Sequence, residues 1–424
     1  MSAGPFIRSH VFAPALLLIL AAPFAYAQTP LTFGWGASLQ TIGTIANAGV
    51  GPAIDSQDAF SLGLELASGA GQGLLSLRVS GQVLYAPQQI VSNFPPLSAL
   101  TGYPTVSAIT FELPPPRLVG WWIRASAGRL VLNEPTGLLL ENPNAIFPNQ
   151  LADGVLFEAR FQGFYGSVGA GYLGLLEKDL NRVRFTPQDD AELADSSVYF
   201  APPRGMAVLR LEADNLFLGQ KLGLFGIGQK DFRSGFSTFD SWYVGLLGTG
   251  PVASAFRQES ALVAALAVPS DASPGVGLLI RELLAWRIPV DFLHEAWFSI
   301  LWASSPGGAL VGFPALAGPP VADTFSTPLT DIVRLELGID AALPAAPTGA
   351  VLTPAFTTRL LLRPSGAQAP GYTFSLSGQY VGTELELSAG LSPLDGVRVL
   401  ARGGTLIASG VVLPYVRLEA GLSL

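Results

Sequence analysis

The sequence predicts an all-β fold: a single transmembrane, antiparallel, up-and-down β-barrel of about 16 strands, within a range of about 14 to 18. Two observations lead to this prediction. Apolar and polar side chains alternate along most of the chain, and 49% hydrophobic residues are combined with only 13% charged residues, where soluble domains carry about 25%. The 48 glycines and 34 prolines argue against a helical bundle or a coiled coil, because both residue types interrupt long helices.

Charge and cysteine content exclude several classes of protein. The 23 basic and 31 acidic residues give a net charge of −8, which offers no electrostatic basis for binding nucleic acid. The chain has no cysteine, which excludes a disulfide scaffold, a thiolate metal site and a thiol nucleophile. We therefore expect no nucleic-acid partner, no metal and no cofactor.

The first 27 residues have the features of a secretory signal peptide. Arg8 precedes a short apolar run from Val11 to Ala22, and residues 25–27 form a cleavage site with small residues at both ends. A spanning helix would need about 20 apolar residues, and Pro14 and Pro23 leave the run shorter than that. We expect residues 1–27 to be removed and residues 28–424 to form one barrel domain. That remainder has no stretch long enough for a spanning helix, so a closed barrel is the membrane-compatible alternative.

The alternation has the period of two that is typical of strands. It is clearest at 75–85, 155–165, 207–214 and 333–340, and it recurs at 59–66, 373–380, 384–391 and 396–402. Where these stretches carry charges, the charges fall on the face opposite the apolar one. Because an arginine at the bilayer midplane costs roughly 2–4 kcal/mol, the apolar face is predicted to face lipid and the charged face a wet lumen. Longer connections are predicted at 91–116, 131–152, 181–204, 304–328 and 341–352, while 281–303 fits either strands or a buried helix.

The end of the chain resembles a known signal. Alternating Val416, Leu418 and Ala420 lead to the carboxyl terminus, as in the final strand of bacterial outer-membrane β-barrels, although that family usually ends in Phe and this chain ends in Leu424. Residues 124–129, 135–137 and 153–155 also resemble segments of porin-type barrels. The resemblance implies location in the cell outer membrane, insertion by the barrel-assembly machinery through the last strand, contact with outer-membrane lipid, and a homotrimer as one expected assembly.

The charged faces supply the candidate functional residues. If these faces point inward, a wall of mixed sign lines the lumen, which disfavours apolar solutes and orients polar ones. Pairing across strands, which would merely satisfy the charges, is the alternative for any single residue. The connection at 131–152 is a candidate constriction loop through Glu134 and Glu141. The pore-lining candidates are Arg78, Arg124, Glu158, Arg160, Arg210, Glu212, Asp214, Arg334, Glu336, Asp340, Arg398, Arg402, Arg417 and Glu419.

Catalysis has little support in the sequence. His294 is the single histidine after the predicted signal peptide, and its neighbour Glu295 would point to the opposite face of a strand. We therefore expect no enzyme and no catalytic residue. The predicted function is a porin-like channel for passive diffusion of small polar solutes, because about 16 strands leave an aqueous lumen. The alternatives are an uptake or binding barrel for hydrophobic molecules, a structural or adhesive surface barrel, and a soluble secreted β protein.

Overall fold

A computed structural model describes the backbone of residues 31–47, 52–70, 73–85, 101–113, 121–140, 151–175, 202–217, 219–233, 238–305, 311–314, 330–345, 350–365, 379–394, 397–408 and 411–423, and most of their side chains from Trp121 onward. The predicted signal peptide and Glu141 lie outside these residues, and so does the side chain of Arg78. No helix of the described residues is long and apolar enough to cross a membrane.

The described secondary structure consists of β-strands. In chain order they are β1 (Leu31–Asn47), β2 (Pro52–Ala70), β3 (Gly73–Tyr85), β4 (Thr101–Leu113), β5 (Trp121–Val131), β6 (Leu151–Phe161), β7 (Phe164–Tyr172), β8 (Arg204–Phe217), β9 (Gln220–Asp231), β10 (Phe239–Ala253), β11 (Phe256–Pro269), β12 (Gly275–Val290), β13 (Leu293–Ala303), β14 (Ile332–Ala341), β15 (Leu343–Ala345), β16 (Ala350–Leu362), β17 (Tyr380–Leu394), β18 (Val397–Ala408) and β19 (Val411–Ser423).

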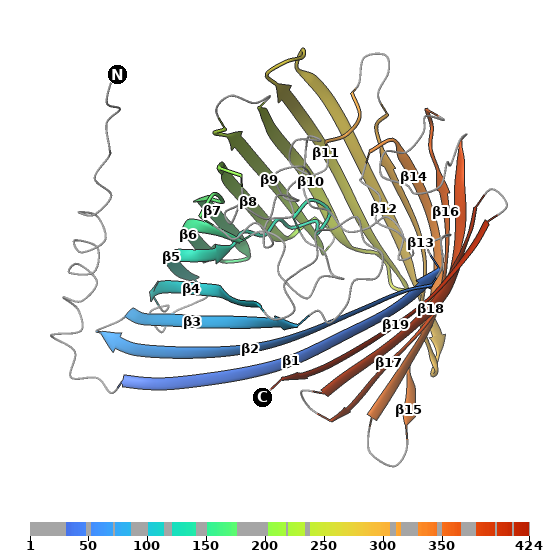
Figure 1. Cartoon of the computed structure of the whole chain (residues 1–424), viewed down its shortest axis with the longest axis horizontal. Helices are drawn as coiled ribbons and strands as arrows, with labels where there is room; N and C mark the ends of the chain where they lie inside the picture. The colour runs from blue at the N-terminus through green and yellow to red at the C-terminus, as the bar shows by residue number, and fades with distance from the viewer. Residues whose placement is uncertain are drawn as a thin grey trace.

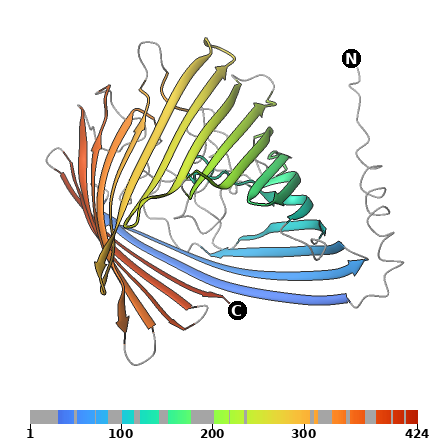
Figure 2. The ribbon, with the colours of Figure 1, turned by 180° about the vertical axis from the view of Figure 1, so that it is seen from behind.

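The strands form one antiparallel ring (Figure 1). Each strand pairs with its neighbours in sequence, and β1 pairs with β19, with Ser38 opposite Ser423 and Ala46 opposite Tyr415. Figure 2 shows the same meeting of the first and last strands from behind. The short β15 pairs with β16 directly beyond β14, so β14 and β15 act as one interrupted strand. Counted this way, the nineteen described strands make a ring of eighteen, at the upper end of the predicted range.

Connections at the two ends of the ring differ in length. At one end, two residues join β6 to β7, and Gln162 and Gly163 have φ values of 44° and 87°, as a tight hairpin with two left-handed residues requires. At the other end, residues 132–150, 173–203, 304–331 and 363–379 connect consecutive strands. We call the end with the β6–β7 hairpin the short-turn end and the end with these four connections the long-connection end. In bacterial outer-membrane barrels the short turns face the periplasm.

Two expectations about the chain's organisation need correction. The strand β4 lies inside the predicted connection 91–116, where several prolines conceal the alternation; Pro104 itself lies at an irregularity in the β3–β4 pairing, a position that tolerates proline. Likewise β15 and the start of β16 fall inside the predicted connection 341–352. The ambiguous segment 281–303 forms strands, β12 and β13, with a turn at residues 291–292. Most of the expected strand at 373–380 lies outside the described residues.

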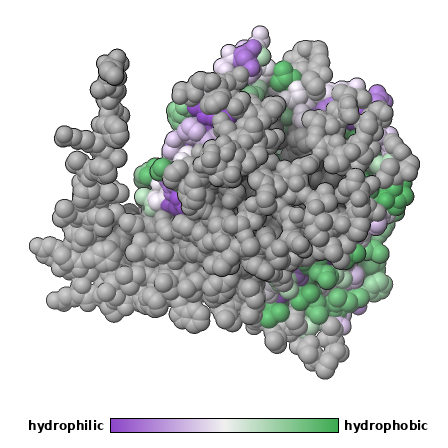
Figure 3. Space-filling model, viewed as in Figure 1, coloured by the Kyte–Doolittle hydropathy of each residue, from purple (hydrophilic) through white to green (hydrophobic). Residues whose placement is uncertain are grey.

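Burial alternates along the strands and separates an inner from an outer face. On β11, Val263 and Ala265 are at most 1% exposed, whereas Leu262 and Leu266 are 44% and 40% exposed. On the space-filling surface, apolar residues gather on the outside of the last strands, where Leu387 and Leu418 are 65% and 56% exposed (Figure 3). An exposed belt of large apolar side chains on the described outer face, from β5 to β19, is what a surrounding hydrocarbon phase requires.

Candidate functional site: the inner wall of the barrel

The inner face of β8–β12 is apolar toward the long-connection end. Phe225 and Ile227 on β9, Tyr243 on β10 and Leu279 on β12 are at most 2% exposed and belong to one buried cluster. This differs from the expectation that every inward face is polar. A bare apolar wall would be unfavourable in a water-filled lumen, and two connections cover this one.

The first covering segment follows β5. Residues 132–140 enter the ring, where Figure 1 shows them in teal. Leu138, Leu139 and Leu140 are 4%, 0% and 1% exposed and join the same cluster as Phe225. The segment is therefore fixed to the wall by apolar contacts, each fully buried leucine contributing roughly 1.5–3 kcal/mol.

Glu134 stabilises the turn of this segment. Its carboxylate accepts hydrogen bonds from the backbone N–H groups of Thr136 at 2.5 Å and Leu139 at 2.9 Å, and from the Thr136 hydroxyl at 2.6 Å. The side chain is only 2% exposed. Glu134 therefore lies within a segment that narrows the lumen, but its charge is directed at the segment's own backbone.

The second covering segment is residues 311–314, between β13 and β14. The Tyr243 hydroxyl donates a 2.6 Å hydrogen bond to the Pro314 carbonyl, and the Phe313 ring is 1% exposed. Gly277 on β12 permits this contact, because a Cβ atom there would lie 2.8 Å from the Phe313 Cα atom. The apolar half of the wall is thus buried under chain from two connections.

The inner face of β14–β19 is charged in the middle of the strands, whereas Leu361, Leu406 and Leu413 nearer the long-connection end are apolar and buried. Arg359 on β16 bridges three carboxylates on both neighbouring strands: Glu336 at 2.8 Å, Glu384 at 2.9 Å and Glu386 at 3.3 Å. The Trp297 indole N–H donates to Glu336 at 3.0 Å, and the Tyr415 hydroxyl donates to Glu386 at 2.5 Å. On the last strands, Arg402 and Arg417 both approach Glu419, at 3.8 Å and 2.8 Å.

The short-turn half of β11–β13 is also charged on its inner face. Arg257 pairs with Glu259 and, at 3.0 Å, with Glu295, while Arg281 lies 3.6 Å from Glu259. A cavity of about 190 Å³ lies between this group and the inward segment, lined by Pro135 and Thr136 on one side and by Glu259 and Arg281 on the other. This cavity thus has charges of both signs on one of its walls.

A third network joins β5–β9. Arg124 lies 3.6 Å from Glu158, which also accepts a 2.9 Å hydrogen bond from the Tyr165 hydroxyl. Arg210 pairs with Glu212 at 2.6 Å. The remaining pairs are Lys221 with Glu212 at 2.7 Å and Arg160 with Asp214 at 2.8 Å.

The register places the described pore-lining candidates on the inner face, where most of them form ion pairs across strands. Arg78 lies opposite Glu65 in the β2–β3 ladder. Arg398 is exposed near the short-turn end. Sequence reasoning missed Lys221, Arg257, Glu259, Arg281 and Arg359; the Arg-x-Glu spacing at 257–259 was a usable signal, whereas the role of Arg359 depends on the pairing of three strands.

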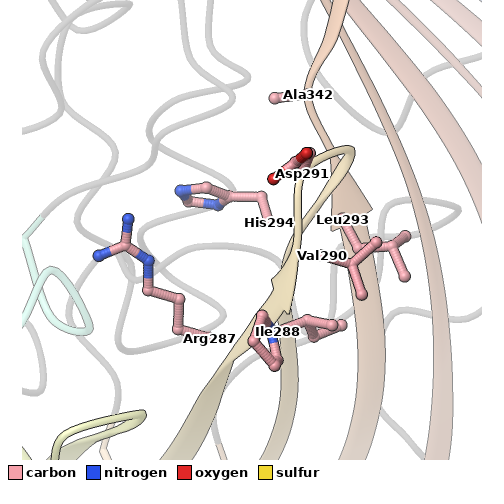
Figure 4. Close-up of a pocket in the computed structure, with 8 residues that line it drawn as sticks. Arg287, Ile288, Val290, Asp291, Leu293, His294 and Ala342 are labelled. Carbon is pink, nitrogen blue, oxygen red and sulfur yellow. The ribbon is translucent and has the colours of Figure 1, made fainter.

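His294 lies at the short-turn end. Its Nδ1 atom is 3.5 Å from an Asp340 carboxylate oxygen, and the side chain is 62% exposed. In Figure 4 it extends in the same direction as Arg287 from the edge of an open cavity of about 350 Å³, close to Asp291. No described group there has the nucleophile and base geometry of a hydrolase.

Searches of protein-family models and of curated proteins found no match. Solved structures do match over nearly the whole chain. Pseudomonas aeruginosa OpdQ has a TM-score of 0.59 at 14% identity and covers 92% of this chain and 98% of its own. Acinetobacter baumannii OccAB2 has a TM-score of 0.58 at 13% identity, with 93% and 98% covered.

The fold is that of a bacterial outer-membrane porin. A third match, Pseudomonas aeruginosa OccK2 (OpdF) in complex with glucuronate, has a TM-score of 0.59 at 13% identity and covers 92% of this chain and 98% of its own. Porin-type barrels with an apolar outer belt reside in the outer membrane. This chain has the same barrel fold, and its described outer face is apolar.

Proposed function

We propose that this protein is a channel through which small polar solutes diffuse across the outer membrane, without catalysis. The observation that carries the proposal is the charged inner wall, where the side chains of Arg160 and Arg257 keep exposures of 50% and 44% inside a ring whose described outer face is apolar. A ring of this strand number leaves an aqueous lumen in porins. The similar structure that contains glucuronate supports small polar molecules as the class of solute.

In this proposal residues 132–140 are the constriction. They narrow the lumen from the apolar wall, so that a passing solute meets Thr136 on one side and the Glu259–Arg281 pair on the other. Paired charges of opposite sign across a narrow passage orient dipolar solutes and disfavour apolar ones. The pore-lining residues of β14–β19 would form the facing wall of the passage.

Passage of hydrophobic molecules has less support. The apolar inner surface at Phe225 and Leu279 is buried together with Leu139 and Phe313, so the described residues offer no open apolar route there. We also propose that residues 1–27 direct export and that β19 carries the signal for barrel assembly, because β19 forms the final strand that meets β1.

Single-channel recording in planar bilayers tests the proposed function. The refolded mature chain should give discrete conductance steps, and liposomes that contain it should swell in small sugars faster than empty liposomes. A folded, heat-modifiable barrel that gives neither steps nor swelling would refute the channel function.

A further inference from the structure

The inner face of β5–β7 carries two aromatic rings beside its charges. Trp122 on β5 and Tyr165 on β7 both lie opposite Arg160 of β6, so the three residues share one row of the inner wall. The ring centroids of Trp122 and Tyr165 are 6.2 Å apart, with the ring planes tilted by 56°. Both side chains are half-buried, whereas their sequence neighbours on the outer face, Ile123 and Phe164, are 45% and 56% exposed. The two rings therefore point into the lumen rather than into lipid.

Charged groups hold this pair of rings in place. The Arg124 guanidinium lies over the Trp122 ring and the Arg210 guanidinium lies over the Tyr165 ring, each 5.1 Å from the ring centroid. The Glu158 carboxylate lies 3.6 Å from Arg124 and accepts a 2.9 Å hydrogen bond from the Tyr165 hydroxyl. Because the rings are fixed before a solute arrives, little side-chain entropy is lost when a solute binds to them.

The wall around the rings is open to the lumen. The side chains of Arg124 and Arg160 are 38% and 50% exposed, whereas that of Arg359, in the network of β14–β17, is 14% exposed. Toward the short-turn end, the β6–β7 hairpin ends directly beyond this row, at the turn formed by Gln162 and Gly163. A solute in the lumen can therefore reach the rings and the charges together.

These groups match the two kinds of surface that a pyranose sugar presents. A sugar ring has C–H groups on its faces, which pack on the electron-rich face of an aromatic ring, and hydroxyls around its rim, which need donors and acceptors. Each arginine of this wall already has a carboxylate partner. The pairs are Arg124 with Glu158, Arg160 with Asp214, and Arg210 with Glu212. An ionic solute has to displace such a partner, whereas a hydroxyl can bridge an ion pair without breaking it.

We propose that Trp122 and Tyr165 form a binding site for neutral pyranose sugars on the inner wall. A C–H face of the sugar packs against the two rings, and its hydroxyls bridge the ion pairs of Arg124 and Arg160 with their carboxylates. The inference rests on the channel function proposed above and names a class of solute for it. A sugar held here is retained at the wall and then continues down its concentration gradient.

Saturation-transfer NMR of the mature barrel in detergent tests binding without relying on conduction. D-Glucose should receive saturation on its ring C–H protons, whereas sorbitol, its open-chain alcohol, should not. Trp122→Leu should weaken glucose binding about five-fold, which is the scale of one aromatic contact. Trp121→Leu is the matched control and should bind as wild type, because Trp121 lies on the outer face of the same strand, opposite the exposed Phe161. Equal signals for glucose and sorbitol, or unchanged binding in Trp122→Leu, would overturn the site.

Single-channel recording separates this proposal from the channel function. Glucose should reduce the wild-type current in a saturable manner, and sorbitol should reduce it only as far as it lowers the conductivity of the bulk solution. Tyr165→Phe keeps the ring and should retain the block by glucose, whereas Tyr165→Leu should lose it; heat modifiability confirms that each variant is folded. Glucose binding in a protein without current steps would refute the channel function and support the site. Current steps without glucose binding would refute the site alone.

Discussion

Two parts of the inner wall differ in the side chains that point inward and in what those side chains contact. On β9–β12, toward the long-connection end, the inward side chains are apolar and two connections bury them, as Phe225 and Leu139 show. In the middle of β14–β19 they are charged, and Arg359 neutralises carboxylates on two adjacent strands. The first part holds inward-folded chain in place, and in the second the buried charges neutralise each other across strands. The comparison teaches that inward side chains of this ring are satisfied in two ways, apolar ones by chain folded over them and charged ones by pairing across strands.

The largest expected effect comes from detaching the anchored segment. Leu139→Asp places a carboxylate where the side chain is 0% exposed, in an apolar cluster. Because burying an unpaired charge costs several kcal/mol, residues 132–140 should leave the wall. We expect single-channel conductance to rise at least two-fold, while the conservative variant Leu139→Met keeps the wild-type value. An unchanged conductance in a folded Leu139→Asp barrel would show that this segment does not narrow the passage.

The second prediction concerns the charged wall. Arg359→Met removes the shared cation of Glu336, Glu384 and Glu386, all of which are largely buried. Loss of one partner from a buried ion pair costs about 3–5 kcal/mol, so chemical unfolding should occur at markedly lower urea concentration. The reversal potential in a salt gradient should also shift toward cation selectivity. Arg359→Lys is the control, and its stability should lie between those of the wild type and Arg359→Met. Stability equal to wild type in Arg359→Met would contradict the assigned network.

A smaller effect is expected at the narrowing. Glu259→Gln leaves Arg281 and Arg257 facing the cavity beside Thr136 with less opposing charge. The channel should become more anion-selective, with a change in stability of no more than about 1 kcal/mol, because these groups are partly exposed. Arg281→Gln should shift the reversal potential in the opposite direction. Shifts of the same sign in both variants would argue that the cavity is not on the conducting path.

The smallest effect should come from an ion pair that belongs to neither wall. Arg129 and Asp153 lie opposite each other on β5 and β6, and two hydrogen bonds of 3.1 Å join them near the long-connection end. Arg129→Gln should destabilise the barrel by about 0.2–1 kcal/mol and leave conductance and selectivity unchanged. A selectivity change as large as that of Glu259→Gln would mean that outer-face charges act on the lumen.

The alternation along the strands was sufficient to predict a membrane-spanning β ring and to assign an inner face to Glu336 and Arg417, because a one-residue change of register would expose every such charge to lipid. It could not predict the apolar wall. Residues 261–267 are apolar on both faces of β11, and what covers them comes from a segment more than a hundred residues earlier. The run Leu138–Leu140 in this connection was the available signal, since three adjacent leucines are not expected in a solvated loop.

The pairing of β1 with β19 also has a practical consequence. Because Ser38 lies opposite Ser423, the first and last strands are already adjacent. A short peptide could join them, and new termini could be opened between Gln162 and Gly163. This would change the order of the strands along the chain while preserving every strand pairing. Such a circular permutant would separate the order in which the strands are synthesised from the order in which they meet.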